Sequence, residues 1–303
     1  MQDEYDQKNR VLVLGGTGFI GRHIVAALLA QNVQTTIGTR SPKEQATNAR
    51  PSQLSIRLQE RTNPEDWADE ISNFDVIINC VGILRPQRGA SYDAVHHLAP
   101  AALAHACANT STRLIHVSAI GLGVGDRSGF LTSKLRGEQA IANSGSDWII
   151  VRPSLLDGKG GFGARWLRAV AKLPFFIVPR GATGQIAAMT ASDLGEAMTN
   201  ICLDTSSGLR LDESRIFELG GTATYTFRDY IQGLRRNYGH PPAFVFLLPN
   251  WLTRLGAHLC DLFHFSPFSF GHWELLQKDN VAKPNRLPEL LQRPPKPVIT
   301  SSD

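Results

Sequence analysis

Short runs of apolar and β-branched residues alternate with longer amphipathic stretches over the first two hundred positions of the chain. In one such stretch, Ile24, Val25, Leu28 and Leu29 recur at the spacing of a helix face that packs against a core. Strands that alternate with helices in this way build a parallel sheet with helices on both of its faces. We therefore predict a doubly wound α/β fold, with strands at 11–14, 33–37, 54–58, 76–79, 114–118 and 148–151.

The polarity of the predicted strands indicates their places in the sheet. Most of them are nearly continuous apolar runs, as expected where helices cover both faces. The run at 33–37 contains Gln and Thr instead, and the run at 54–58 alternates with Ser and Arg. We therefore expect these two strands toward one edge of the sheet.

The pattern changes beyond Pro153, where glycines and a short apolar stretch at 173–178 follow. Ser192 and Asp193 then open a helix, and 216–221 predicts a last strand and turn. The predicted organisation is one large domain over 10–221, with 155–182 contributing to a substrate side, and a small, partly helical C-terminal lobe and tail over 222–303.

Charge and cysteine content exclude several classes of protein. The chain of 303 residues carries 31 Lys and Arg against 27 Asp and Glu, scattered along its length, so nucleic acid is not an expected partner. The four cysteines match no disulfide or zinc pattern, and His96, His97 and His116 match no metal-ligand pattern, so no metal site is expected. The chain shows no leader pattern and no apolar run of about 18 residues, which predicts a cytoplasmic location.

The strand predicted at 11–14 runs directly into a glycine-rich turn and then into an amphipathic helix. Gly15 permits a tight turn, Gly18 lets main-chain N–H groups approach a pyrophosphate at the helix N-terminus, and Gly21 lets the helix close on the sheet. A glycine pattern alone is weak, but this strand and helix around it indicate a Rossmann dinucleotide-binding domain. The residues predicted to contact the cofactor here are Gly15, Thr17, Gly18, Phe19, Ile20, Gly21 and Arg22.

The spacing G-x-x-G-x-x-G, with Thr17 between the glycines, resembles the short-chain dehydrogenase/reductase superfamily. Later landmarks follow in the family's order, with Gly82 after the fourth predicted strand, Ser118 at the end of the fifth and Lys134 in the next helix. The segment 217–221 and the lobe after it resemble the atypical branch that includes the nucleotide-binding accessory subunit of respiratory complex I and its bacterial relatives. This resemblance implies further cofactor contacts from Cys80, Val81, Gly82, Lys134 and Pro153.

The end of the second predicted strand bears on the choice between NAD and NADP. A chain that prefers NAD normally has Asp or Glu there, which binds the ribose 2′-hydroxyl and repels a 2′-phosphate. This chain has Arg40 instead, with Arg22 and Lys43 as further candidates. A guanidinium can make paired, charge-assisted hydrogen bonds to a phosphate, so NADP(H) is expected over NAD(H).

One position departs from the family pattern. The resemblance implies a tyrosine four residues before Lys134, whose phenol donates a proton while the lysine lowers its pKa and holds the nicotinamide ribose. Phe130 occupies that position and has no hydroxyl. Lys134 and Ser118 keep their family positions as candidate catalytic residues, and another acid, either Lys134 itself or water, would have to donate the proton.

The sequence is therefore compatible with two functions, one catalytic and one not, and it does not decide between them. In one, it is an NADPH-dependent oxidoreductase with a non-standard proton donor that acts on a small apolar carbonyl, enone or quinone. In the other, it carries NADPH without catalysis, as the complex I resemblance implies, and serves as an accessory, assembly or redox-sensing protein. A sugar-nucleotide epimerase shares the fold but normally keeps the tyrosine, so Phe130 argues against that class.

The most apolar part of the chain lies at 243–265. Pro249, Arg254 and Asp261 interrupt it, so it does not predict a membrane span. It can pack against the sheet domain or line a substrate pocket. Alternatively, its Trp251 and phenylalanines can meet a membrane surface or a partner protein, which would make the protein peripheral to a membrane.

Overall fold

The computed structural model describes residues 9–42, 51–203, 215–263 and 269–300. The chain divides into two compact units, each built from three separate stretches. Unit 1 comprises residues 1–118, 133–151 and 194–217, and unit 2 comprises 119–132, 152–193 and 218–303. The domains expected at 10–221 and 222–303 stay a prediction.

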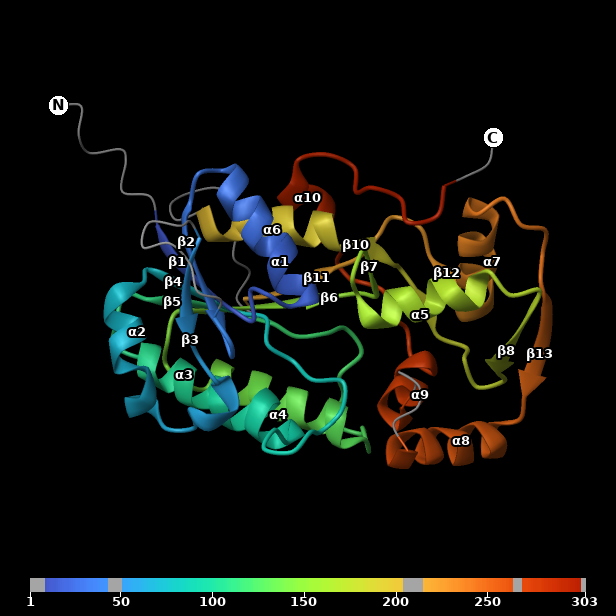
Figure 1. Ribbon diagram of the computed structural model, residues 1–303, viewed down its shortest axis with the longest axis horizontal. Helices are drawn as coiled ribbons and strands as arrows, with labels where there is room; N and C mark the ends of the chain where they lie inside the picture. The colour runs from blue at the N-terminus through green and yellow to red at the C-terminus, as the bar shows by residue number, and fades with distance from the viewer. Residues whose placement is uncertain (1–8, 43–50, 204–214, 264–268, 301–303) are drawn as a thin grey trace. The chain divides into compact units, whose positions relative to one another are not determined.

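A seven-stranded sheet forms the core of unit 1, with the last residues of two of its strands belonging to unit 2 (Figure 1). Its strands are β1 (Arg10–Leu14), β2 (Gln34–Thr39), β3 (Ser52–Ser55), β4 (Val76–Asn79), β5 (Arg113–Val117), β6 (Trp148–Pro153) and β11 (Ile216–Leu219). Their order is β11-β6-β5-β4-β1-β2-β3, and the pairings from β6 through β3 are parallel. The doubly wound fold is confirmed, as is the place of the second and third strands toward one edge.

The third strand differs from its predicted range of 54–58. β3 begins at Ser52, whose hydroxyl lies 2.8 Å from that of Thr36 on β2, and it ends at Ser55. Leu58 instead begins a 3₁₀ turn, η1 (Leu58–Glu60), in which its side chain is buried. The alternation of apolar and polar residues that predicted a strand up to Leu58 therefore ends in a turn, where Leu58 is buried without pairing in the sheet.

Helices cover both faces of this sheet (Figure 1). One face carries α1 (Phe19–Ala30) and α6 (Ala191–Leu203), and the other carries η2 (Pro64–Trp67), α2 (Ala68–Asn73), the π-helical η3 (Ala94–Leu98), α3 (Ala99–Cys107) and α4 (Gly129–Ala142). In α1, Ile24, Val25 and Leu28 are buried as predicted. Leu29 was expected with them, but it is 37% exposed, since it lies outside the buried stripe of the helix.

The described residues of unit 2 form three small two-stranded sheets and five helices. The sheets pair β7 (Leu156–Asp157) with β10 (Met189–Thr190), β9 (Gln185–Ile186) with β12 (Tyr225–Thr226), and β8 (Phe175–Pro179) with β13 (Phe244–Leu248). The helices are α5 (Phe162–Ala171), α7 (Phe227–Asn237), α8 (Asn250–Phe263), α9 (Phe270–Leu276) and α10 (Leu287–Leu291). Its core includes Leu167, Phe176, Tyr230 and Ile231. Buried Arg235 also crosses it and donates to the carbonyls of Ala171 and Leu173.

The tail after residue 283 is anchored by a buried carboxylate. Asp193 was expected in a helix N-terminal cap, and it does lie in the first turn of α6, where its N–H donates to Thr190. Its side chain, however, is fully buried and accepts hydrogen bonds from the Arg293 guanidinium at 2.8 Å and the Lys296 N–H at 2.7 Å. Asp193 therefore ties the tail to the body of unit 2.

Candidate nucleotide-binding site

The turn between β1 and α1 is tight enough to require glycine at several positions. Gly15 has a φ of +76°, and its N–H donates to the carbonyl of Gly38 at 2.9 Å. A Cβ at Gly15 would lie 3.0 Å from a methyl group of Val81, and a Cβ at Gly21 would collide with the carbonyl of Gly15. These close approaches bring the start of α1 directly against the end of β1, as the motif predicts.

The N-terminal end of α1 is open to an anion. Its N-cap is Gly18, no described side chain caps it, and its first turn holds no acidic residue. The main-chain N–H groups at this end carry the positive pole of a twelve-residue helix. Arg22 adds a cation one turn along, with its guanidinium 5.9 Å from the ring centroid of Phe19. Such an end binds phosphate readily.

Residues 80–82 follow β4 and lie against this turn. The side-chain oxygen of Asn79 accepts from the Val81 N–H at 3.1 Å, while its amide nitrogen lies 3.2 Å from Nδ1 of His116. The Cys80 thiol donates to the carbonyl of Leu14 at 2.9 Å. Desolvation raises the pKa of Cys80 to about 12, so it is a neutral structural thiol.

Arg40 lines a surface pocket of about 350 Å³ just beyond the end of β2. The lining residues are Arg40, Ser41, Arg57, Gln59, Glu60, Arg88 and Gly89. Arg57 reaches Glu60 at 3.4 Å, and both of these side chains are well exposed. Among its described lining residues, this space therefore has three arginines and one carboxylate. Lys43, the other expected cation, lies outside the described residues.

Arg57 and Arg88 were not predicted from the sequence. They lie 17 and 48 positions beyond Arg40, in segments where no motif marks them. The parallel register of β2 with β3 brings the first of them close, and a short bridge between Gln87 and Ala90 shapes the turn that holds the second. Only the folded chain brings these cations together.

Lys134 lies in α4 close to the turn after β4. A Cβ added at Gly82 would be 3.9 Å from Nζ of Lys134 and 3.8 Å from Nε2 of His96. Desolvation lowers the pKa of Lys134 from 10.5 to about 8, against the opposing charge of Glu138 one helical turn along. Lys134 is therefore an ammonium at neutral pH that releases its proton more easily than an ordinary lysine.

Two buried histidines near this lysine are neutral. Nε2 of His96 accepts from the Ile83 N–H at 3.1 Å, and Nδ1 lies 3.1 Å from the Ser133 hydroxyl. Desolvation and the charge of Lys134 lower the pKa of His96 to about 2 and that of His116 to about 3. Both imidazoles therefore act as fixed hydrogen-bonding groups. Among the described residues, no three His, Cys, Asp or Glu side chains gather as metal ligands.

Ser118 follows β5 and carries a buried hydroxyl that has no hydrogen-bond partner within the described chain. Such a hydroxyl is costly unless a ligand satisfies it. Together with the glycine turn and the open end of α1, it gives unit 1 the donors and the close backbone approach that a dinucleotide needs. Pro153 ends β6 and belongs to unit 2.

Phe130 is enclosed where the family pattern has tyrosine. It is 7% exposed and stacks on the ring of His272, with centroids 5.9 Å apart and planes 20° from parallel. A Cβ at Gly271 would lie 3.2 Å from Cβ of Phe130, so α9 packs closely on this position. Within unit 2 the aromatic ring therefore serves packing.

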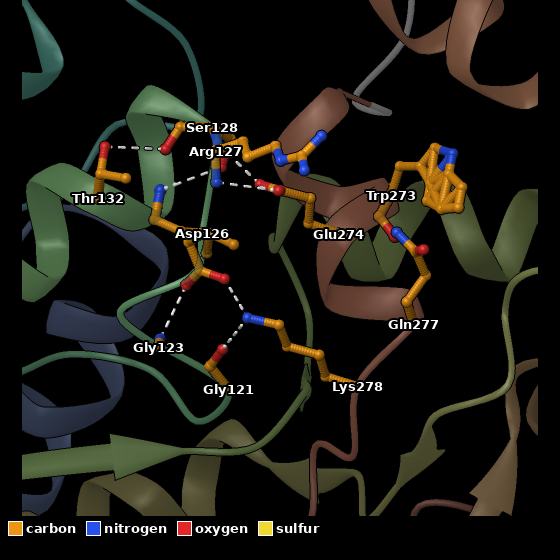
Figure 2. Close-up of polar contacts among 11 residues, drawn as sticks. Gly121, Gly123, Asp126, Arg127, Ser128, Thr132, Trp273, Glu274, Gln277 and Lys278 are labelled. Atoms are coloured by element: carbon orange, nitrogen blue, oxygen red, sulfur yellow. Dashed lines mark hydrogen bonds and ion pairs between the residues drawn. The ribbon is translucent and has the colours of Figure 1, made fainter.

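Figure 2 shows how α9 is fastened to the segment that leads into α4. The Glu274 carboxylate accepts from the N–H groups of Arg127 at 3.0 Å and Ser128 at 2.8 Å, the two residues that precede α4. The Ser128 hydroxyl in turn accepts from the Leu131 N–H at 3.3 Å and so caps the helix. Lys278 pairs with Asp126, whose side chain is 1% exposed and also accepts from the Gly123 N–H. No sequence pattern pointed to these contacts, because their partners are about 150 residues apart.

The structure also bears on the apolar segment at 243–265. No helix of the described residues is long and apolar enough to cross a membrane. The last residues of that segment lie outside the described residues.

Comparisons with known proteins agree with this geometry. The family model described as NAD(P)H-binding matches residues 15–172, just over half of the chain. The chain is 27% identical to the mitochondrial NADH-ubiquinone oxidoreductase 40 kDa subunit of Neurospora crassa, over 71% of this chain and 56% of that protein. It is 22% identical to the ceramide reductase of Caulobacter vibrioides, over 83% of this chain and 78% of that protein. The chain spans little more than half the length of the first curated relatives it matches.

Solved structures show the same fold at low identity. The UDP-glucose 4-epimerase of Thermus thermophilus in complex with NAD has a TM-score of 0.57 and 20% identity, covering 79% of this chain and 86% of that one. The UDP-glucuronic acid 4-epimerase of Bacillus cereus has a TM-score of 0.65 and 16% identity, covering 96% and 94%. Together these findings confirm the predicted resemblance and the presence of a domain for a nicotinamide cofactor.

Proposed function

Because the chain belongs to the NAD(P)H-binding family, we propose that it is an NADPH-dependent reductase of an apolar carbonyl, enone or quinone-type substrate. The observation that carries the proposal is Lys134, a lysine with a pKa near 8 beside the turn at Gly82. An acid with a pKa close to the working pH is suited to proton transfer. It can replace the phenol that Phe130 lacks.

A bound NADPH supplies the hydride. With a carbonyl substrate, Lys134 would donate its proton to the carbonyl oxygen, and the products would be an alcohol and the oxidised nucleotide. The neutral amine of Lys134 then takes a proton from water. The unpartnered Ser118 hydroxyl can donate a hydrogen bond to the same oxygen, which strengthens as negative charge develops there.

The preference for NADP(H) over NAD(H) is supported by the pocket at Arg40. A 2′-phosphate there would meet the guanidinium groups of Arg40, Arg57 and Arg88 and one carboxylate, Glu60. Phosphate gains charge-assisted hydrogen bonds from arginine, whereas a ribose hydroxyl gains little. Arg40→Ala is expected to weaken NADPH binding by about 1.5 to 3 kcal/mol and to leave NADH binding nearly unchanged.

The decisive experiment combines binding with turnover. Purified protein is tested for NADPH oxidation against panels of quinones, enones and lipid-like carbonyl compounds, with Lys134→Ala as the matched variant. The name of the Caulobacter relative, a ceramide reductase, supports the choice of lipid-like substrates. Turnover that depends on Lys134 is the expected result.

A second candidate function is favoured by the enclosure of Phe130 under α9. With no acid at this position, the protein would hold NADPH as an accessory, assembly or redox-sensing component of a respiratory complex. The Neurospora relative, named as a subunit of NADH-ubiquinone oxidoreductase, supports this alternative. NADPH that co-purifies firmly while every substrate panel stays silent would favour it over the reductase.

A further inference from the structure

An exposed apolar face runs along the paired strands β8 and β13 of unit 2. The register sets Phe244 beside Phe175 and Phe246 beside Ile177. Residues paired in register point to the same side of a sheet, so these four side chains share one face. Their exposed fractions are 54% for Phe175, 57% for Ile177, 79% for Phe244 and 60% for Phe246.

The opposite face of the same strands secures them to the core. Phe176 and Val178 alternate with the exposed residues and are 3% and 4% exposed, within the hydrophobic cluster of unit 2. Inner contacts therefore hold the strand pair in place. On the outer face, Phe175 and Phe246 contact each other edge to face at 6.3 Å between ring centroids, yet both stay more than half exposed. Exposed apolar groups gathered in this way mark an interaction site.

Helix α8 follows β13 in the chain and has an exposed apolar side of its own. Figure 1 shows β8 and β13 side by side, with β13 leading into α8. Trp251, Leu255 and Leu259 recur every four residues along one side of the helix and are 67%, 53% and 42% exposed. Thr253 and Ala257 on its other side are buried. An amphipathic helix with tryptophan on its apolar side is typical of a protein that lies in a membrane interface.

The charge of the surrounding segments is of one sign. From Gly158 to Ser192 the chain has five Lys and Arg and no Asp or Glu, and from Tyr230 to Cys260 it has three and none. The rest of the chain carries 23 basic residues against 27 acidic ones, so these segments hold the excess of positive charge. Of their eight basic residues, Arg235 is buried and Arg168 pairs with Asp157, which leaves six for the surface. Exposed Lys172, Arg180 and Arg254 stand next to its apolar residues in the sequence.

We propose that this face of β8, β13 and α8 binds the surface of a bilayer rich in anionic lipid. Its phenylalanines, Trp251 and Leu255 enter the interface, while Lys172, Arg180 and Arg254 contact the headgroups. Pairing of this face with a second copy would bring cations against cations, which disfavours a dimer as the occupant. None of these residues belongs to the nucleotide site, so the surface can be tested independently of the reductase proposal.

The test is flotation of the full chain with vesicles of phosphatidylcholine, alone or with phosphatidylglycerol. The variants are Phe244→Ser with Phe246→Ser, and Arg180→Gln with Arg254→Gln. Val124→Ser is the matched control, because Val124 is 93% exposed in unit 2 but lies outside the face. Thermal melting and NADPH titration of each variant establish that it is folded.

We expect the wild type to bind vesicles that contain phosphatidylglycerol more strongly than vesicles of phosphatidylcholine alone. Added salt should weaken this binding. The phenylalanine pair should weaken it at least about tenfold, and each arginine replaced should weaken it about fivefold. The control should bind like the wild type. The proposal is overturned if the wild type floats with neither vesicle, or if the phenylalanine variant floats like the wild type. It is also overturned if the phenylalanine change converts a dimer to a monomer in a protein that binds no vesicle.

Discussion

Replacement of Lys134 probes the proton-transfer step directly. Desolvation places its pKa at about 8, so roughly nine-tenths of the protein carries the ammonium at pH 7. Above that pKa, the protonated fraction falls about tenfold for each pH unit. We therefore expect NADPH oxidation by the wild type to decline as the pH rises through about 8. Lys134→Met, which keeps the chain length and removes the acid, should lower kcat by about 10²- to 10⁴-fold.

The matched control is Lys134→Arg, which keeps a positive charge but does not titrate below pH of about 12. Whatever activity it retains should lose the alkaline decline seen in the wild type. The assay is the initial rate of NADPH oxidation over a pH series, with NADPH affinity titrated in parallel to separate binding from chemistry. Full turnover in the methionine variant, or an unchanged alkaline decline in the arginine variant, would refute the role of Lys134.

Three further outcomes follow from the structure. Arg57→Ala should weaken NADPH binding by about 1 kcal/mol, measured by calorimetry, while NADH binding stays the same. Equal losses of affinity for both nucleotides would show that Arg57 does not bind the 2′-phosphate. His96 and His116 have folded-state pKa values far below the ordinary 6.5, so the unfolded chain binds more protons under acid conditions. Stability should therefore fall as the pH drops below about 6.5, by up to about 1.4 kcal/mol per pH unit for each histidine, and urea unfolding of His96→Gln should show a shallower fall. Glu274→Ala should cost about 1 to 2 kcal/mol in the same assay, because it removes two charge-assisted hydrogen bonds to the segment before α4. Glu289→Ala, which loses an exposed ion pair, should cost under about 1 kcal/mol.

The fold could be predicted from apolar runs and glycine spacing because these patterns depend on residues that are close in the sequence. The apolar runs around β1, β4 and β5 are buried on both faces of the sheet, and the glycines after β1 are required by contacts within a few residues of the turn. These features depend on neighbours in sequence or on a period of two or 3.6 residues. They placed the doubly wound sheet and the glycine turn correctly.

Features that depend on distant partners could not be predicted. Arg57 and Arg88 join Arg40 only through strand register and a turn, and Glu274 accepts hydrogen bonds from a segment about 150 positions earlier in the chain. Leu58 was assigned to a strand because a buried residue in a 3₁₀ turn has the same alternation as one in a sheet. In each of these cases a tertiary contact decides what the residue does.

The two nucleotides are best compared by calorimetric titration of one preparation of the protein with NADPH and with NADH. We expect both nucleotides to bind through the glycine turn, and NADPH to bind at least about tenfold more tightly because its additional phosphate meets the arginine pocket. Equal affinities, or tighter binding of NADH, would contradict the assignment of that pocket. A folded protein that binds neither nucleotide would contradict the claim as a whole.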